Sequence, residues 1–261
     1  MIGPARRFAD LTTAEVPHAV TSDSIMVLPL GAIEPHGPHL PLATDLVMAE
    51  SVAAKAVRRA AAGDGAGSDV WLLPSIGYTK SNEHARLPGT MWISTSTLYD
   101  TVMDIGTSVA ETPAKTLVFV NGHGGNSSLL DVLLRDLRHH HDLRTFLVSS
   151  PPTPGESERG IGVHAGWSET SMMLHLAPEL VDMDAAADLG PQVAHSVADC
   201  THIGFGGPVK FGWLSTDLSP SGVVGDPTGA SAAAGERLVE EYISSIVEAL
   251  PDIATFNPGA L

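Results

Sequence analysis

Four short and almost wholly apolar runs, separated by longer amphipathic stretches, constrain the fold of this 261-residue chain more than any other feature. The runs cover residues 25–30, 70–73, 116–120 and 145–148. A strand reads as an unbroken apolar run when helices cover both faces of its sheet, as they do in parallel sheets. The alternation of strand and helix therefore predicts an α/β protein with a mostly parallel central sheet.

The longer stretches have apolar residues spaced three and four apart, which is the pattern of amphipathic helices. They cover residues 46–62, 96–110, 127–141, 169–176 and 231–250. Residues 149–162 are rich in Pro, Gly, Ser and charge, and we expect them to form a long loop over the carboxyl edge of the sheet. Residues 189–229 have no regular pattern. Because no repeat or linker interrupts the chain, residues 1–261 are expected to form one domain.

Charge and composition exclude several classes of partner. The chain has 14 Lys and Arg against 30 Asp and Glu, and its formal net charge of −16 repels the phosphate backbone of nucleic acids. It has neither a signal-peptide pattern nor the apolar run of about 18 residues that spans a membrane, so a cytoplasmic protein with no membrane partner is predicted. The single cysteine, Cys200, excludes an intramolecular disulfide and is expected to be structural.

Histidines and carboxylates follow the predicted strands closely. Because the carboxyl ends of parallel strands share one edge of a sheet, side chains beyond those ends should converge in space. Glycines on both sides of one histidine, in Asn-Gly-His-Gly-Gly-Asn at residues 121–126, leave room for a bulky centre beside it. Imidazole and carboxylate groups together suit zinc, manganese or iron. Six residues form this set: Glu34, His36, Asp45, His123, His164 and Glu169.

We expect this edge to hold two divalent metal ions per subunit, bridged by one water molecule. Two such ions lower the pKa of the water and polarise the carbonyl group that it attacks. His164 is the candidate general acid and base, because the ordinary pKa of histidine suits proton transfer to a leaving group near neutral pH. The expected ligands are Glu34, Asp45 and His123 for one ion, and His36, Asp45 and Glu169 for the other.

Each assignment has a structural alternative. Asp45, Asn126 and Ser168 lie where helices are predicted to begin, so each could be a capping residue. Glu169 would also suit the first turn of a helix, because the helix dipole favours a negative charge there. His164 could orient a ligand instead of transferring protons.

Several other polar residues have a less specific pattern. Glu83 and His84 lie in a polar loop after the second run, where they could contact the substrate or serve the loop alone. Trp167 could form a wall of the substrate pocket or simply pack against its neighbours. His39 is left out of the ligand set, because nearby prolines indicate a rigid loop in which it orients Glu34 or lines the pocket. The histidines at 139–141 are expected to complement a helix C-terminus.

Three motifs together carry a resemblance to a known family. They are Leu-Gly-Ala-Ile-Glu-Pro-His-Gly-Pro-His-Leu-Pro-Leu-Ala-Thr-Asp at residues 30–45, the histidine loop at 121–126, and His-Ala-Gly-Trp-Ser-Glu-Thr-Ser at 164–171. The chain resembles the creatininase family, also called creatinine amidohydrolases. This resemblance implies a three-layer α/β/α fold and a dinuclear centre that usually holds zinc, manganese or iron. It also implies hydrolysis of a cyclic or linear amide of a small molecule, and a homohexamer.

The chain departs from the creatinine-hydrolysing members at three positions. Those members have a metal-binding glutamate where this chain has Gly125, an aromatic residue at the position of Gly124, and a tryptophan at that of Gly160. Glu169 is therefore the candidate that replaces the missing carboxylate, and a substrate other than creatinine is expected. Formamides, peptide ends, lactones and cyclic sugar-derived ketones stay open as substrates, and the non-enzyme alternative is a metal-stabilised binding protein.

Overall fold

The computed structural model describes residues 6–63, 68–149, 153–158, 160–186, 200–205 and 208–259. At its centre is a four-stranded sheet with strand order β2-β1-β3-β4, in which all neighbouring strands are parallel. The predicted parallel sheet is therefore confirmed, and each strand lies within one residue of its expected bounds. The strands are β1 (Ile25–Leu30), β2 (Val70–Leu72), β3 (Thr116–Asn121) and β4 (Arg144–Ser149).

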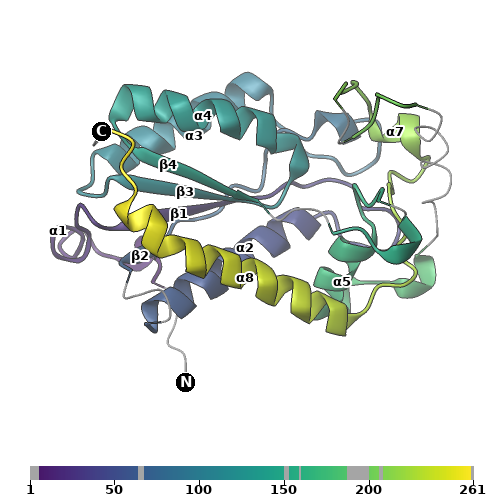
Figure 1. Ribbon diagram of the computed structural model, residues 1–261, viewed down its shortest axis with the longest axis horizontal. Helices are drawn as coiled ribbons and strands as arrows, with labels where there is room; N and C mark the ends of the chain where they lie inside the picture. The colour runs from purple at the N-terminus through teal and green to yellow at the C-terminus, as the bar shows by residue number, and fades with distance from the viewer. Residues whose placement is uncertain are drawn as a thin grey trace.

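Helices cover both faces of this sheet and make the three layers expected for an α/β/α fold (Figure 1). One face carries α3 (Thr95–Ala110) and α4 (Ser127–His141), and the other carries α2 (Thr44–Ala61) and α8 (Ala232–Thr255). Alternate side chains of β1 enter the two cores, Ile25 and Val27 on one side and Met26 and Leu28 on the other. This double burial explains why β1 has no polar residue.

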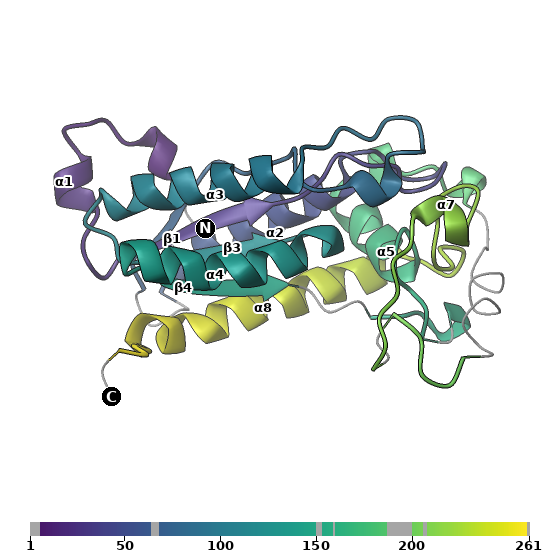
Figure 2. The same ribbon diagram turned by 90° about the horizontal axis from the view of Figure 1, so that it is seen from above.

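The carboxyl edge of the sheet is covered by α5 (Trp167–Leu176), which packs against the N-terminal half of α8 (Figures 1 and 2). Shorter elements complete the described chain. The short α-helices are α1 (Val16–Ala19) and α7 (Ser215–Leu218). The single 3-10 turns are Phe8–Asp10, Asn82–His84, Gly124–Asn126, Glu156–Glu158, Pro178–Leu180 and Met183–Ala185.

The helix termini decide one of the alternatives posed by the sequence. Helix α2 begins after Ala43, so Asp45 lies inside its first turn, and α5 begins after Gly166, one residue before Ser168. Asn126 precedes α4, yet its side chain makes no capping hydrogen bond. The capping interpretation of Asp45, Asn126 and Ser168 is therefore wrong, because the chain turns into each helix without a bond from these side chains.

The irregular part of the chain is only partly described. Of the unassigned stretch 189–229, residues 189–199 and 206–207 lie outside the described residues, and the remainder contains α7 and a bridge between His164 and Val224. Cys200 is exposed and unpaired. Among the described helices, none has the length and apolar character that a bilayer crossing requires.

Candidate metal centre

A cluster of titratable side chains lies just beyond the carboxyl edge of β1 and β3. Six of its members are almost completely buried, with at most 6% of each residue exposed, and the seventh, Glu169, is partly buried. Buried charged groups are rare unless they are paired or bind a metal ion. The members are Glu34, His36, Asp45, His84, His123, His164 and Glu169.

Two glycines at the strand ends let α2 approach this edge. A Cβ atom at Gly31 would lie 2.4 Å from the Cα atom of Leu46, and one at Gly122 would lie 2.5 Å from the carbonyl oxygen of Asp45. Both atoms belong to the backbone of α2 and cannot move aside as a flexible side chain could. The absence of side chains at these two positions therefore brings Asp45 between the ends of β1 and β3.

The first group of possible ligands is Glu34, Asp45 and His123, all buried. His123 Nδ1 lies 3.3 Å from Glu34 Oε1 and 3.1 Å from Asp45 Oδ2. Glu34 comes from the segment after β1, His123 from the segment after β3, and Asp45 from α2. The predicted ligands of one ion thus meet in space.

The second group is His36, His164 and Glu169, whose ligand atoms lie within 4.8 Å of one another. His36 Nε2 is 3.8 Å from Glu169 Oε2 and 3.0 Å from Asp45 Oδ1. The two oxygens of Asp45 thus face different histidines, Oδ1 towards His36 and Oδ2 towards His123. The predicted ligands of the other ion also meet, with His164 beside them.

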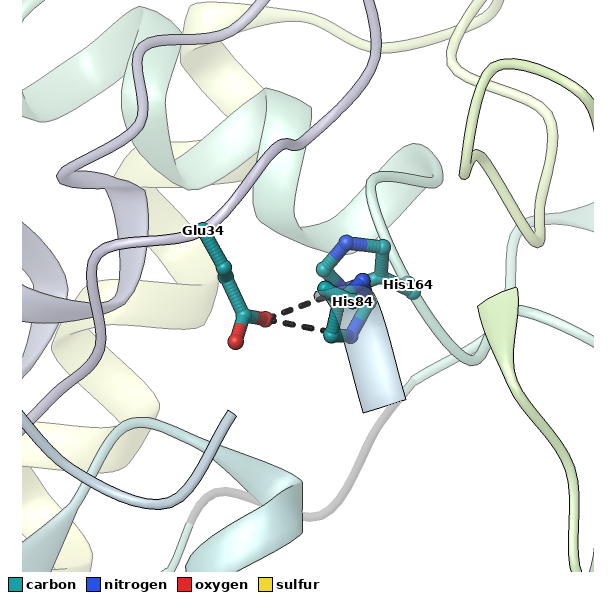
Figure 3. Close-up of side chains that lie close together, drawn as sticks. All are labelled: Glu34, His84 and His164. Atoms are coloured by element: carbon teal, nitrogen blue, oxygen red, sulfur yellow. Dashed lines mark ion pairs between the residues drawn. The ribbon is translucent and has the colours of Figure 1, made fainter. Parts of the chain in front are cut away.

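A third group joins Glu34 and His164 to His84 (Figure 3). Glu34 Oε1 is 3.5 Å from His84 Nε2 and 3.6 Å from His164 Nδ1. The His164 ring packs against two other imidazole rings. Its centroid lies 4.3 Å from that of His84 and 4.2 Å from that of His36. His84, expected from sequence to contact substrate or serve its loop, is therefore a member of the buried cluster.

Backbone carbonyl groups set the tautomer of three histidines. His123 Nε2 donates to the carbonyl oxygen of Lys80 (2.9 Å) and His164 Nε2 donates to that of Pro35 (2.8 Å). His36 Nδ1 donates in the same way to the carbonyl oxygen of Glu34 (3.0 Å). A carbonyl group only accepts, so in each neutral ring the other nitrogen carries the lone pair and faces the cluster. This arrangement is typical of histidines that bind metal ions.

The donor set fits divalent metal ions. Glu34 Oε1 and Asp45 Oδ2 are buried without a hydrogen-bond partner among the described residues, although they face ring nitrogens. The distances from Glu34 Oε1 to His84 and His164, 3.5 and 3.6 Å, are too long for hydrogen bonds. Two ligands of one tetrahedral ion, each bound at about 2.0–2.1 Å, lie about 3.3–3.4 Å apart. The distances from Glu34 Oε1 to three ring nitrogens, 3.3 Å to His123, 3.5 Å to His84 and 3.6 Å to His164, therefore match shared coordination better than hydrogen bonding.

The surroundings of Glu34 and Glu169 shift the pKa values of these two carboxylates in opposite directions. Burial raises the pKa of Glu34, but the nearby charge of His123 is the main effect that outweighs it, so this pKa lies well below its ordinary value. Burial raises the pKa of Glu169 to about 7, and the nearby charge of Asp45 acts in the same direction, against the opposing charge of His36. Glu34 is thus ionised at neutral pH, whereas Glu169 is half protonated in the metal-free protein.

The pKa values of His36 and His164 are likewise shifted in opposite directions. Burial lowers the pKa of His36, but the charge and hydrogen bond of Asp45 outweigh it and raise this pKa to about 10. Burial and the charges of His36 and His84 lower the pKa of His164 to about 3. In the metal-free protein His36 therefore carries a proton that a metal ion must displace. His164 is neutral, and its pKa lies well below the near-neutral value on which its predicted acid–base role is based, so that role depends on its position in the cluster.

Glu83 lies on the outer side of His123. Its Oε1 is 3.5 Å from His123 Nε2, and its Oε2 forms an ion pair with Lys80 Nζ at 2.9 Å. A Cβ atom at Gly125 would lie only 2.0 Å from Glu83 Oε1. The space beside Gly125, where creatinine-hydrolysing members have a glutamate, thus holds a carboxylate from another loop.

Two further residues named from the sequence lie at the edge of the cluster. The indole of Trp167 donates from Nε1 to the carbonyl oxygen of Gly229 (3.0 Å), so it ties the start of α5 to the turn before α8. His39 Nε2 is 3.0 Å from Thr170 Oγ1. His39 thus bonds to α5 instead of orienting Glu34.

Sequence reasoning missed Ser81, whose hydroxyl group donates to Glu34 Oε2 (2.5 Å). This bond holds one oxygen of Glu34 and leaves Oε1 directed at the histidines. Ser81 lies in an irregular polar loop, and no spacing or flanking motif in the sequence marks it.

A cavity of about 440 Å³ opens beside the cluster. His123 and Glu169 line it on the metal-ligand side, and Met48, Met172 and Tyr242 contribute apolar walls. Its volume lies within the range of about 300–1,000 Å³ of small-molecule sites. A substrate bound there would reach two of the candidate ligands.

The parallel α/β fold, with a buried cluster of histidines and carboxylates at its carboxyl edge that could hold metal ions, leads to a class of protein, the hydrolases. The chain belongs to the creatininase family, whose model, described as creatinine amidohydrolase, matches residues 9–250. The resemblance stated from the motifs is confirmed.

Relatives of this chain hydrolyse amide bonds. A mycofactocin precursor peptide peptidase of Mycobacterium tuberculosis is 36% identical over 240 residues, which are 90% of this chain and 87% of the relative. A creatinine amidohydrolase of Pseudomonas putida is 31% identical over 191 residues, or 65% of this chain and 70% of the relative. The protein is thus a hydrolase of the amidohydrolase type.

Solved structures agree with this fold. Creatininase with Mn has a TM-score of 0.74 at 25% identity and covers 97% of this chain and 100% of its own. A mutant creatininase of Zn–Zn type has a TM-score of 0.72 at 25% identity, with 95% of this chain and 98% of its own covered. Manganese and zinc are thus metals of these structural neighbours.

Proposed function

We propose that the protein is a dinuclear metal-dependent amidohydrolase in which Asp45 is shared between two ions. One observation carries this proposal: the two oxygens of the buried Asp45 carboxylate face different histidines, His36 at 3.0 Å and His123 at 3.1 Å. Glu34 and His123 would complete the ligand set of the first ion, and Glu169 and His36 would complete that of the second. Glu169 lies 3.8 Å from His36, which supports it as the replacement for the carboxylate missing at Gly125.

Zinc, manganese or iron would suit this mixture of imidazole and carboxylate. When bound, the ions would supply an activated water molecule and polarise the carbonyl group of the substrate. The protein residues would hold them and keep the site dry. Saturation of every coordination position by protein atoms, as in the non-enzyme alternative, would leave no position for water.

His164 is the proposed proton carrier. Its Nε2 is fixed by the carbonyl oxygen of Pro35, and its neutral ring directs the Nδ1 lone pair into the cluster. Nδ1 can therefore accept a proton from the attacking water and pass it to the leaving nitrogen. Glu34 Oε1 lies 3.6 Å from Nδ1 and the His84 ring centroid lies 4.3 Å from that of His164, so both residues would restrict where that proton travels (Figure 3).

An amide at a peptide end is the substrate class supported best. Relatives that cover most of this chain are named precursor peptide peptidases. Gly124 lines the cavity without filling it, and the walls from Met48 and Met172 suit an apolar side chain. A small cyclic amide is the second candidate, because the Pseudomonas relative is a creatinine amidohydrolase. The homohexamer and the cytoplasmic location expected above stay predictions.

The test uses metal-free protein reloaded with zinc, manganese or iron and assayed on short peptides, small cyclic and linear amides, and lactones. We expect hydrolysis of a peptide amide only after reloading. His123→Ala should lose activity and metal content together, whereas His140→Ala, at the exposed C-terminal end of α4, is a matched control that should lose neither. Full hydrolysis by metal-free protein would overturn the proposal.

A further inference from the structure

Glu158 is a buried carboxylate that the proposed reaction does not use. It ends the 3-10 turn Glu156–Glu158, in the loop over the carboxyl edge, and only 2% of its surface is exposed. Among the described residues, the buried carboxylates Glu34 and Asp45 face histidines of the metal centre, but the contacts of Glu158 are of another kind.

Three backbone N–H groups donate to the Glu158 carboxylate. Oε2 accepts from Gly155 (2.6 Å), and Oε1 accepts from both Trp167 and Asp226 (2.9 Å each). These donors belong to the long loop, the first residue of α5 and the turn before α8. One side chain therefore joins the long loop to the start of α5 and to the more remote turn before α8, through the strong hydrogen bonds that a carboxylate acceptor makes.

Three glycines make room for this carboxylate. A Cβ atom would lie 2.0 Å from Glu158 Oε1 at Gly166, 2.5 Å from the same oxygen at Gly225, and 2.3 Å from Oε2 at Gly162. No side chain fits at such distances without moving the carboxylate. The backbone around Glu158 is therefore shaped to hold a carboxylate at this place.

The segment held by Glu158 carries the α5 half of the metal centre. Trp167 N–H is one of the groups that have no partner inside helix α5, so Glu158 caps the helix on which Glu169 occupies the first turn. Ala165 precedes it with φ +54°, a conformation that L residues adopt only under constraint from their surroundings. The N–H of Ala165 donates to Glu169 Oε2 (2.5 Å).

Glu158 also restrains the backbone at His164, through the turn before α8. Val224, two residues before Asp226, donates to the carbonyl oxygen of His164 (2.8 Å) and accepts from the N–H of Val163 (2.8 Å). Because Glu158 holds both Asp226 and Trp167, it fixes the backbone on either side of the segment from His164 to Gly166.

We infer that Glu158 is a positioning residue for the second metal ion: its carboxylate holds Glu169 and His164 in register with His36. This inference rests on the proposed dinuclear function. Glu158 contacts none of the proposed ligands itself and acts through the backbone of α5 and the adjoining turn. Partners of this kind change metal affinity by about 10–100-fold when they are removed.

The test is a zinc titration of the full-length protein in competition with a chromogenic chelator, which resolves two binding steps. Glu158→Gln keeps the shape of the side chain but loses the charge and one acceptor oxygen. We expect the second step to weaken by about 10–100-fold and the first step, on Glu34, Asp45 and His123, to change by less than about threefold. Glu158→Ala should show a larger loss in the second step.

Ser94→Ala is the control for general destabilisation. Ser94 Oγ accepts from the N–H of Thr97 at the start of α3, on the opposite face of the sheet, so this variant should lower the melting temperature and leave both zinc steps unchanged. If Glu158→Gln weakens both steps equally, or neither, the positioning role is overturned. A single step in the unmodified protein would overturn the dinuclear centre itself, and the inference with it.

Discussion

The two halves of the candidate metal centre are built differently. Glu34 and His123 follow β1 and β3, which pair in parallel from Ile25 opposite Thr116 to Leu30 opposite Asn121. His164 and Glu169 follow a loop, and a bridge to Val224 and the backbone contacts of Glu158 hold them in place. The sheet thus sets the first half, whereas side-chain and backbone bonds between loops set the second.

This difference indicates a division of work. We expect the half next to the sheet to be the more rigid and to bind its ion more tightly, because Glu34 and His123 lie shortly after the paired ends of β1 and β3. Both halves reach the cavity, the first through His123 and the second through Glu169 and Met172 of α5, so changes in α5 alter both the affinity of the second ion and substrate fit. Substitutions in the two halves should therefore have separable effects.

The largest effect is expected at Asp45, which both halves share. Asp45→Asn keeps the size of the side chain but removes the charge that faces His36 and His123. We expect loss of both metal ions and a fall in activity of about 10³-fold or more, because the ions supply most of the electrostatic stabilisation. Metal analysis and an amide hydrolysis assay measure the two losses. Asp131→Asn, exposed on α4, should change neither, and tight binding of two ions by Asp45→Asn would refute the shared carboxylate.

A smaller and more selective loss is expected for Glu169→Gln. This variant removes one ligand from the α5 half and leaves Glu34, Asp45 and His123 in place. We expect one ion to stay bound per chain while activity falls by about 10²–10³-fold, the size typical for loss of one electrostatic contact at a reacting carbonyl. Elemental analysis after dialysis counts the ions. Retention of two ions would contradict the assignment of Glu169 as a ligand.

The two halves should also respond differently to pH. In the metal-free protein His36 has a pKa of about 10 and Glu169 one of about 7, so both bind protons that a metal ion must displace below pH 7. The pKa of His123 is also raised well above its ordinary value, while that of Glu34 is lowered. Affinity for both ions should thus rise with pH, by about tenfold per pH unit for each proton displaced.

The two sites are expected to differ in how steeply their metal affinity rises with pH. The first ion displaces about one proton, from His123, at pH values below the raised pKa of that residue, and the second displaces about two below pH 7 and about one between pH 7 and 10. Zinc titrations at several pH values measure both slopes. Equal slopes below pH 7, or affinity that falls as pH rises, would contradict the assignment of ligands to the two ions.

The smallest effect is expected from Thr170→Val. The hydroxyl group of Thr170 lies 3.0 Å from His39 Nε2 and ties α5 to the segment after β1. Its loss leaves a buried ring nitrogen unpaired, which should cost about 1–3 kcal/mol in the free energy of unfolding. Denaturant unfolding measures this change. Metal binding at the first site should be unaffected, and a loss of the first ion instead would show that the two halves are not independent.

Much of the fold could be predicted from local pattern. The runs that form β1 and β3 are apolar because both faces are buried, and α4 begins and ends where its apolar spacing begins and ends. The convergence of Glu34, His36 and His123 could also be expected, since parallel strands end at one edge. The position of Asp45 could not be predicted from the strand ends alone, because it depends on the close approach of α2 to Gly31 and Gly122.

The rest depends on contacts between loops. His84 enters the cluster, Ser81 holds Glu34 and Glu158 caps α5, yet none of them follows a strand or shares a spacing with its partner. Glu83 fills the space beside Gly125 for the same kind of reason, from a segment about forty residues away in sequence. Such pairings are set by tertiary packing, which a single sequence does not encode in any short window.

The most direct test of the shared metal centre is X-ray diffraction at the zinc absorption edge from crystals of the zinc-loaded protein. We expect two anomalous peaks per chain on either side of Asp45, one beside Glu34 and His123 and the other beside His36 and Glu169. A single peak, or two peaks of which neither lies next to Asp45, would contradict the shared metal centre.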